Sequence, residues 1–503
     1  MRLDWALAAL PVVLILVLMV GFRWGAAKAG PAGWLLAVIL AALRFGTGMQ
    51  LLGLAHVKAL LLALDVQLII WGAFLLYRVA DEAGAVAVIS ESLPRLVQDR
   101  GMQALLIGWP FASFLQGVGG FGVPVAVTAP LLVGLGFQPI VAVVIPSLGH
   151  AWSVTFGSLG SSFQALMVAT GLAAEQLAPP TAALLGMAGF GCGITAAHAA
   201  GNWGAVRRLA GAILLLGAVM GGVQYWLATH ELWHLAGFGG SLAGLIVGLL
   251  FARQPGGREG ARPLALALSA YLVLILITLG VQLISPLGEF LGRVQIRLEF
   301  PELRTSLGYV TPAESGRIIP IFRHPGALLA YSAVVGYLIY QRAGRYGPGS
   351  PRRILEGTVS RVLPASVAVL ALVSMAVVMA HAGMTQLLAD GLAQAAGRSF
   401  PALSPWIGAL GAFMTGSNTN SNVVFGQLQL QTAQLLGLSP PILLAAQTAG
   451  GAIGSVFAPS KIVMGTTTAG LEGREGEVLR RLLAYCAILL TGISLVVTLL
   501  AAR

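Results

Sequence analysis

Charged side chains are scarce in this chain. Asp, Glu, Lys and Arg make up only 9% of its 503 residues, whereas 57% are hydrophobic. Soluble domains carry about 25% charged residues. A chain so poor in charge cannot cover a water-facing surface of this size, so a soluble globular protein is excluded. The composition instead predicts an all-α polytopic membrane protein, with lipid tails as its outer solvent.

Signals for cofactors and metals are also lacking. The two cysteines, Cys192 and Cys486, lie far apart in apolar surroundings and indicate neither a disulfide framework nor a metal site. The dipeptide Gly-Lys does not occur, which excludes a Walker A motif and direct ATP-driven transport by this chain. The G-x-G-x-x-G pattern from Gly117 to Gly122 lies in an apolar run without a βαβ unit, so it does not indicate a dinucleotide. We expect no cofactor, no metal and no enzymatic activity.

The net charge of +11 comes from short basic clusters between apolar runs. Such clusters mark cytoplasmic loops in membrane proteins, so the expected partner is membrane lipid and not nucleic acid. Placing all of them in the cytoplasm leaves the longest polar stretch, about residues 285–325, as an external loop. The clusters are Arg23/Lys28, Arg78/Arg95/Arg100, Arg207/Arg208, Arg253/Arg258/Arg262, Arg342/Arg345/Arg352/Arg353 and Arg474/Arg480/Arg481.

Many apolar runs of the chain approach the length of a spanning helix, about 20 residues. Their number predicts about 12 to 14 membrane segments. They form a single transmembrane domain, residues 1–503. The first run, Trp5 to Phe22, precedes Ala27-Lys28-Ala29, which faintly resembles a signal-peptidase site. We favour a retained first helix because this run is long, and a cleaved signal is the alternative.

Two stretches of the chain share Gly and Pro landmarks, which indicates an internal repeat. The charge pattern makes the copies enter the membrane from opposite sides, so we predict inverted repeat units of about 81–200 and 381–475 with re-entrant or broken helices. Such interrupted segments point to a transporter binding site. Chance likeness of Gly-rich segments is the alternative. The pairs, separated by the same 301 positions, are Gly136/Gly437, Pro139/Pro440, Gly149/Gly450 and Phe156/Phe457; Ala83-Gly84 similarly resembles Ala382-Gly383.

A polar motif interrupts the second unit. Gly416 is followed by six consecutive hydrogen-bonding side chains, Ser417 to Asn422, in an apolar context. Buried amides and hydroxyls without partners cost several kcal/mol each, so these groups need each other, water or a polar substrate. We favour a binding site because the first unit also breaks, at Gln116-Gly117. A polar turn that satisfies itself is the alternative.

Three ionisable residues stand in apolar surroundings. Lys461 follows Pro459 in the second unit, and a mid-membrane charge usually has a functional partner, such as an anionic substrate. Snorkelling to the cytoplasmic face is the alternative for Lys461. His150 is either a proton carrier or a helix-packing residue. Asp65, the lone acid between Ala59 and Tyr77, is either functional or interfacial.

These motifs resemble the L-lactate permease family of bacterial secondary carriers. The matching stretches are Gly120 to Phe137, Val154 to Gly157, Leu410 to Ser417 with Ser421-Asn422, and Gly470 to Gly476. The resemblance implies a bacterial inner (plasma) membrane carrier for lactate or a related 2-hydroxy monocarboxylate, usually coupled to protons. It also implies inverted repeats with re-entrant hairpins, in agreement with the landmark pairs.

The sequence departs from the family pattern at two acids, because the family has carboxylates where Gln116 and Asn418 stand. Amides do not titrate, so the coupling candidates become His150, Asp65 and Lys461. A fixed positive charge on Lys461 would neutralise a carboxylate without a proton.

The sequence therefore predicts a secondary active transporter of L-lactate or a related small 2-hydroxy monocarboxylate. Another small organic anion, such as glycolate or a sulfonate, is the alternative. An intramembrane hydrolase using Ser147 or Ser153 with His150, or a sensor without flux, is more remote. A homodimer is left open. The predicted substrate-binding residues are Gln116, Gly119, Gly120, Gly122, Ser147, His150, Ser153, Ser158, Ser417, Asn418, Thr419, Asn420, Asn422, Ser460 and Lys461.

Overall fold

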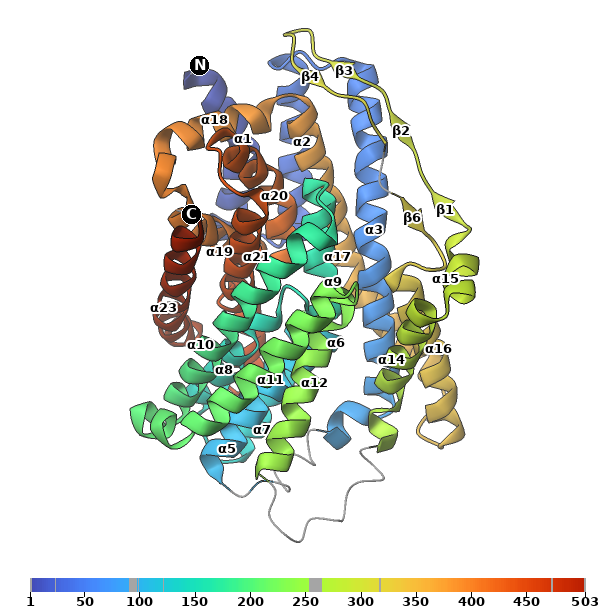
Figure 1. The fold of residues 1–503 in the computed structure, drawn as a ribbon, viewed down its shortest axis with the longest axis vertical. Coiled ribbons are helices and arrows are strands. Elements are labelled where there is room, and N and C mark those ends of the chain that lie inside the picture. The colour runs from blue at the N-terminus through green and yellow to red at the C-terminus, as the bar shows by residue number, and fades with distance from the viewer. Residues whose placement is uncertain are drawn as a thin grey trace.

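The computed structural model describes residues 2–22, 24–89, 97, 99–120, 122–252, 265–315, 318–471 and 474–501. The described chain is almost wholly helical, which confirms the predicted all-α polytopic architecture (Figure 1). Some residues named above, or contained in the stretches given above, lie outside the described residues. They include Arg23, Arg95, Phe121, Arg253, Arg258, Arg262, Glu472 and Gly473.

Two long helices pack against each other and run along one side of the molecule (Figure 1). They are α3 (Met49–Glu82) and α17 (Ser350–His381), and each ends at an Ala-Gly pair whose glycine, Gly84 or Gly383, has a positive φ. Because the left-handed region suits glycine, this pair stops both helices in the same way. Helix α16 (Pro325–Arg342) packs on α3, whereas α2 (Ala26–Leu43) packs on α17. Helix α1 (Arg2–Leu16) and the π-turn η1 (Val17–Gly21) precede α2.

The first unit consists of a hairpin and a broken helix. Its hairpin turns at Gly122, which has φ 89° and is followed by Pro124 in the first turn of the next helix. Proline suits that position because its missing N–H would have no helical partner. The elements of this unit are α5 (Arg100–Leu106), η2 (Ile107–Phe111), α6 (Ala112–Val118), α7 (Val123–Gly134), α8 (Pro139–Gly149), η3 (Ala151–Ser153) and α9 (Gly157–Thr170).

The second unit also has a hairpin that is followed by two helical segments. Its hairpin turns at Gly416, which has φ 70°. The helix that follows the hairpin begins at Pro440, three residues after Gly437. The corresponding helix of the first unit begins at Pro139, three residues after Gly136. Both of these glycines have a positive φ. The elements are α18 (Met384–Ala396), η4 (Gly397–Ser399), α19 (Phe400–Thr415), α20 (Asn418–Leu435), α21 (Pro440–Val456) and α22 (Pro459–Thr468).

One landmark pair marks the same close helix crossing in both units. A Cβ atom on Gly149 would lie 1.9 Å from the carbonyl oxygen of Gly108, and one on Gly450 would lie 1.9 Å from that of Pro405. Each glycine therefore allows two backbones to touch, as in small-residue packing of membrane helices. The repeated landmarks thus have repeated structural roles, whereas the inverted orientation of the units remains a prediction.

The remaining helices flank these units. The largest buried cluster surrounds Trp109 and Trp152, where α8, α10, α21 and α23 meet. Gly193 of α10 makes room for the Trp109 ring, since a Cβ atom there would lie 2.6 Å from it. The flanking helices are α10 (Ala174–Arg208), α11 (Ala210–Thr229), α12 (Trp233–Ala252), α14 (Ser269–Leu283), α15 (Ser285–Gly292) and α23 (Glu475–Ala501).

Spanning helices are fewer than the apolar runs. Within the described residues, eight helices are long and apolar enough to cross a membrane, or up to ten if each of two bent pairs counts as one span. The bent pairs are Pro139–Ser153 with Gly157–Thr170, at 50°, and α14 with α15, at 92°. The sequence count of 12 to 14 segments is larger because runs that are half-helices or shorter apolar helices, such as Val123–Gly134, were counted separately.

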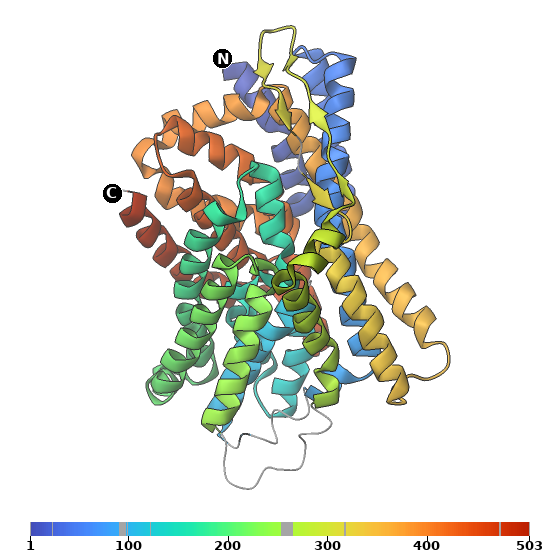
Figure 2. The same ribbon diagram turned by 45° about the vertical axis from the view of Figure 1, so that its right-hand side comes forward.

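A narrow strand segment departs from the helical pattern and falls in the predicted external loop. We call residues 295–315 and 318–320 the strap. It runs along the outer side of α3 towards the end of the molecule that carries the N-terminus (Figures 1 and 2). Three antiparallel pairs hold it together: β1 (Gln295–Ile296) with β6 (Ile319–Pro320), β2 (Glu299–Phe300) with β5 (Glu314–Ser315), and β3 (Leu303–Arg304) with β4 (Val310–Thr311).

Candidate functional site

The first broken helix is strained at its break. Ser158, Leu159 and Gly160 all have left-handed backbone angles, with φ of 46°, 52° and 82°. Such angles cost about 1–3 kcal/mol at a non-glycine residue, and they cluster at functional sites. The Ser158 hydroxyl lies against Gly120, where a Cβ atom would be 1.8 Å from Oγ. The break therefore rests directly on the turn of the first hairpin.

Gln116 lies on the other side of this break. A Cβ atom on Gly157 would be 2.8 Å from Gln116 Nε2, so only glycine allows this approach. Gln116, Gly120 and Ser158, three of the predicted site residues, are thus brought together. Gly119 and Gly122 are not part of this group, because Gly119 packs on the Tyr77 ring and Gly122 on Met464 of α22.

The polar motif of the second unit forms the first turn of α20. Ser417 is the N-cap, and its hydroxyl accepts a hydrogen bond from the backbone N–H of Asn420 at 3.4 Å. The cap directs Asn418, Thr419 and Asn422 inward, where all three are buried. They contact residues in and just before α9 and residues of α21. We call Thr155, Ser162, Asn418, Thr419, Asn422 and Thr448 the amide cluster.

Hydrogen bonds join the amide cluster across the two units. Asn418 Nδ2 donates to Thr155 Oγ1 at 3.1 Å and to Thr448 Oγ1 at 3.3 Å. Asn422 Nδ2 donates to Thr448 Oγ1 at 2.8 Å and to the carbonyl oxygen of Ser162 at 2.9 Å. The hydroxyls of Ser162 and Thr419 lie 2.9 Å apart. The second hairpin is therefore bound to the break of the first unit.

Several buried acceptors near these bonds lack a donor within the described structure. The side-chain oxygens of Asn418, Asn420 and Asn422 make no hydrogen bond, and neither does Oε1 of Gln116. Leaving a buried acceptor unsatisfied costs about 1–3 kcal/mol. These oxygens are therefore suited to receive hydrogen bonds from a ligand that carries a hydroxyl group.

Lys461 of α22 adds a cation to this polar region, next to Ser455 of α21. It is only 9% exposed, so the structure does not support the snorkelling alternative. Its ammonium donates to Ser455 Oγ at 3.0 Å. Asn418 Oδ1 lies against Gly451, since a Cβ atom there would be 2.1 Å away. Thr448, Gly451 and Ser455 are spaced i, i+3 and i+7 and share one helix face. On that face the free acceptor Asn418 Oδ1 and the buried Lys461 ammonium lie about one or two helical turns apart.

The remaining predicted residues have local roles in this conformation. Ser147 Oγ donates to the Val143 carbonyl at 2.8 Å, and His150 Nδ1 lies 2.6 Å from the Pro146 carbonyl. Ser153 Oγ donates to the His150 carbonyl at 2.9 Å. The remote hydrolase alternative is not supported, because the Ser147 and His150 side chains each bond to a carbonyl of their own turn and not to each other. Ser460 Oγ lies beside Gly416.

Asp65 belongs to a second buried polar group. Its Oδ1 lies 2.8 Å from His324 Nε2, and its Oδ2 accepts from Gln164 Nε2 at 2.6 Å. Asp65 and His324 are 1% and 3% exposed. His324 Nδ1 accepts from the Gly326 N–H at 3.1 Å, so a neutral ring carries its proton on Nε2 and donates to Asp65. This pair connects α3, the start of α16 and the broken helix α9.

Sequence reasoning placed Thr155 within a predicted site segment, Ser147–Ser158, without naming it, and missed Ser162 and Thr448 of the amide cluster and also His324. Their partners lie far away in the chain, 263 residues for Thr155 and Asn418 and 259 for His324 and Asp65. Thr448 carried a weak signal, because it stands 301 positions after the predicted site residue Ser147.

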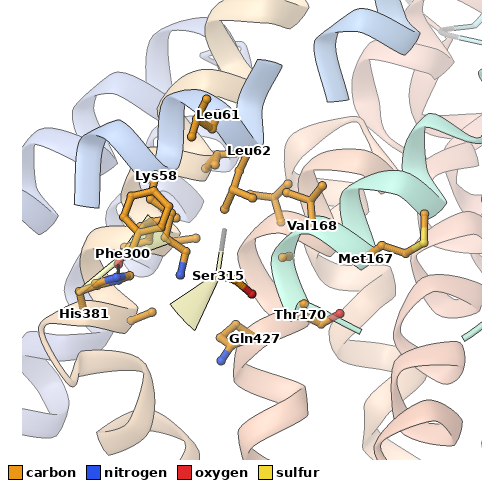
Figure 3. Close-up of a pocket in the computed structure, with 17 residues that line it drawn as sticks. Lys58, Leu61, Leu62, Met167, Val168, Thr170, Phe300, Ser315, His381 and Gln427 are labelled. Atoms are coloured by element: carbon orange, nitrogen blue, oxygen red, sulfur yellow. Dashed lines mark hydrogen bonds between the residues drawn. The ribbon is translucent and has the colours of Figure 1, made fainter. Parts of the chain in front are cut away.

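A cavity of about 340 Å³ lies outside the amide cluster, none of whose six residues lines it. It lies between α3, the end of α9, α17 and α20, and the strap covers part of it. Lys58 and His381 lie on one side of this hollow, across from Val168 and Met167 (Figure 3). The cavity begins beside Val423, the neighbour of Asn422 in the sequence.

Two relatives of this chain are named permeases. The glycolate permease GlcA of Escherichia coli (strain K12) is 26% identical over 537 residues, covering 98% of this chain and 95% of the relative. The L-lactate permease of Halalkalibacterium halodurans is 28% identical over 508 residues, covering 97% and 95%. Among solved structures, MtrF of Neisseria gonorrhoeae is similar with a TM-score of 0.47 and 13% identity, over 86% of this chain and 80% of that chain.

The profile of the L-lactate permease family matches residues 4–262 and 318–502, which is most of the chain. It leaves out residues 263–317, which hold α14, α15 and most of the strap. The family resemblance predicted from the motifs is thereby confirmed. The protein is a multi-pass transporter of the bacterial inner membrane for a small, lactate-like organic anion, not an enzyme, and it belongs to the L-lactate permease family.

Proposed function

We propose that this chain is a secondary active transporter of L-lactate or a related small 2-hydroxy monocarboxylate. The observation that carries the proposal is the α21 face that aligns the free Asn418 Oδ1 with the Lys461 ammonium. A 2-hydroxy acid offers the complementary groups, a hydroxyl donor and an anionic carboxylate on the neighbouring carbon. The hydroxyl donates to Asn418, while the carboxylate accepts from Lys461 and from a hydroxyl of the cluster.

Transport proceeds by alternating access in this proposal. The amide cluster holds the two units together by hydrogen bonds and is closed, with every member buried. Substrate binding replaces some of these bonds, so that α9 and α20 part on one side and then on the other. We propose that the units, about residues 81–200 and 381–475, are inverted repeats, which gives the two sides equivalent motions. A homodimer is compatible with this scheme and is not needed by it.

Glycolate is a second candidate substrate. It is favoured by the similarity to the glycolate permease GlcA, which covers 98% of this chain. Glycolate is a 2-hydroxy monocarboxylate that lacks the methyl group of lactate, so the same hydrogen bonds serve both. An apolar pocket distinguishes two ligands that differ by one methyl group by only about 1–3 kcal/mol of binding free energy. A carrier with this site would therefore accept both lactate and glycolate.

The coupling step is assigned to Asp65 and His324 in this proposal. Asp65 is a buried carboxylate, and Gln164 links it to the broken helix α9. A change in the protonation of the pair alters a hydrogen bond that holds α9 against α3 and α16. His150 is less suited, because its Nδ1 binds the Pro146 carbonyl of its own turn. Lys461 acts as an anion contact and not as the proton carrier.

Uptake of labelled L-lactate into proteoliposomes that contain the purified protein tests the proposal. We expect uptake above that of empty liposomes, stimulated by a pH gradient that is acidic on the substrate side. Unlabelled glycolate should compete with it, whereas a small sulfonate should compete only if the 2-hydroxyl contact contributes little. Absence of uptake by folded protein would contradict the proposal.

A further inference from the structure

The first turn of α12 packs against the break of α9. A Cβ atom on Gly160 would lie 2.7 Å from the Trp233 ring and 3.1 Å from the Cα atom of His234. One turn further along α12, a Cβ atom on Gly237 would lie 2.7 Å from the carbonyl oxygen of Phe156. Because these approaches leave no space between the two elements, any movement of the break must be accommodated by this turn of α12.

His234, in this turn, has no hydrogen-bond partner. Its side chain is buried, with 8% exposure, and neither ring nitrogen makes a hydrogen bond within the described part of the chain. A histidine ring carries a proton on at least one nitrogen, so at least one buried donor is unsatisfied. Such a donor raises the free energy of this conformation, because it has lost its bonds to water. A conformation in which His234 meets an acceptor would remove that cost.

An unsatisfied acceptor lies on α9. Gln164 is 2% exposed, and its Nε2 donates to Asp65 Oδ2 at 2.6 Å. An ionised Asp65 only accepts hydrogen bonds, so it fixes the orientation of the Gln164 amide and leaves Oε1 for another donor. This oxygen is buried and has no donor among the described residues. Gln164 Oε1 and the N–H group of His234 are therefore complementary.

Ring contacts and electrostatics place these two side chains in adjoining parts of the structure. Gln164 follows Phe163, whose ring centroid lies 5.7 Å from that of Trp233, and Trp233 precedes His234. His234 is also within electrostatic range of His324, the partner of the carboxylate that holds Gln164. A small displacement of α9 along α12 would suffice to bring the free donor and the free acceptor together.

We propose that His234 is a positioning residue that donates a hydrogen bond to Gln164 Oε1 when the break of α9 moves during transport. The bond extends the chain of Gln164, Asp65 and His324 to α12, and it favours the moved conformation because it satisfies two buried groups at once. This role needs the N–H group of the ring and no change in its protonation. The inference rests on the proposed function, since it requires a conformational change in the transport cycle.

Thermal unfolding and lactate exchange of a His234→Leu variant test the proposal together. The described conformation loses no hydrogen bond in this variant, so its melting temperature should equal or exceed that of the wild type. The maximal rate of lactate exchange in proteoliposomes should fall at least about fivefold, as expected for loss of one buried hydrogen bond in the moving step. Lactate affinity, measured by lactate-dependent thermal shift, should stay unchanged because His234 does not contact the substrate.

Three further variants separate a donor from a packing residue. His234→Gln keeps a side-chain N–H and should restore most of the exchange rate, which a proton-carrying role would not allow. Adding His234→Leu to Gln164→Leu should slow exchange no further than Gln164→Leu alone. His198 is the matched control, because its Nδ1 lies 2.8 Å from Tyr485 Oη. His198→Leu should lower the melting temperature and leave the exchange rate unchanged.

Several results would overturn the inference. They are a melting temperature of His234→Leu that falls as far as that of His198→Leu, an unchanged exchange rate, slow exchange in His234→Gln, and independent effects of the two leucine substitutions in the double variant. Normal exchange by the wild type in such a case would leave the proposed function standing. Absence of exchange by the folded wild type would overturn the proposed function and this inference with it.

Discussion

Asn418 donates a 3.1 Å hydrogen bond to Thr155 across 263 residues of sequence. The bond joins the first turn of α20 to the segment between η3 and α9, so one amide links the two units. An acid at position 418 would have no N–H to donate to this bond. The amide at this position does not titrate and supplies a donor between the units.

The amide cluster is expected to bind substrate more than it stabilises the fold. Asn422→Ala removes the bonds to Thr448 and Ser162 and should weaken L-lactate binding at least about tenfold, since a buried hydrogen bond to a charged or polar partner is worth about 1–3 kcal/mol. Binding is measured by lactate-dependent thermal shift or by competition against labelled lactate, with protein abundance recorded in parallel.

Gln429 supplies the matched control for Asn422. It is another buried amide of α20, but it bonds to Ser404 and Gln447, which are not members of the amide cluster. Gln429→Ala should lower thermal stability and abundance while the remaining folded protein binds lactate normally. If Asn422→Ala lowers abundance and binding in equal proportion, as Gln429→Ala does, the cluster amides are structural.

Lys461 is expected to contact the substrate anion. Lys461→Gln keeps most of the side-chain volume but removes the charge, so it should raise the KM for lactate about tenfold or more, as expected for loss of a charge-assisted hydrogen bond. Initial uptake rates across a range of lactate concentrations check this. Lys461→Arg should retain part of the affinity, and an unchanged KM in Lys461→Gln would refute the contact.

The Asp65–His324 pair is expected to couple transport to protons. Asp65→Asn and His324→Gln should each abolish uptake driven by a pH gradient while sparing exchange of internal for external lactate, because exchange needs no net proton movement. The measurement compares the two assays in the same proteoliposomes. His150→Gln serves as the comparison variant. Loss of gradient-driven uptake in His150→Gln alone would move the coupling role to that histidine.

The repeated helix crossings give a prediction for stability. Gly149→Ala and Gly450→Ala place a methyl group 1.9 Å from a backbone oxygen, so each should destabilise the protein by about 1–3 kcal/mol or more. Gly134→Ala, at a helical glycine with open space around it, should have little effect. Thermal unfolding of the purified variants in detergent measures this, and equal melting temperatures for all three would be inconsistent with a tight crossing.

The local features of the fold were predictable from sequence. Gly136 before Pro139 and Gly437 before Pro440 carry their conformational signal within a few residues, a positive φ followed by a helix start. The polar break at Gly416 was equally visible, because an N-cap and a left-handed glycine are local devices. The number of spans was less predictable, since an apolar run does not show whether it is a whole or a broken helix.

The partners in the site could not be predicted in the same way. Asp65 stood out as a lone acid, but its partner His324 lies 259 residues away, at the start of the helix that follows the strap in the sequence. Lys461 was ambiguous because burial depends on the packing of α22, which the flanking residues do not determine. Only the tertiary structure shows that it bonds to Ser455 and is 9% exposed.

Counterflow of L-lactate is the most direct test of the central claim, that the chain is a carrier whose amide cluster holds a 2-hydroxy monocarboxylate. Proteoliposomes preloaded with unlabelled L-lactate are diluted into a trace of labelled L-lactate, without ATP or an ion gradient. We expect transient accumulation of label above equilibrium, supported also by preloaded glycolate and lost in Asn422→Ala. Accumulation no greater than in protein-free liposomes, or unaffected by Asn422→Ala, would contradict it.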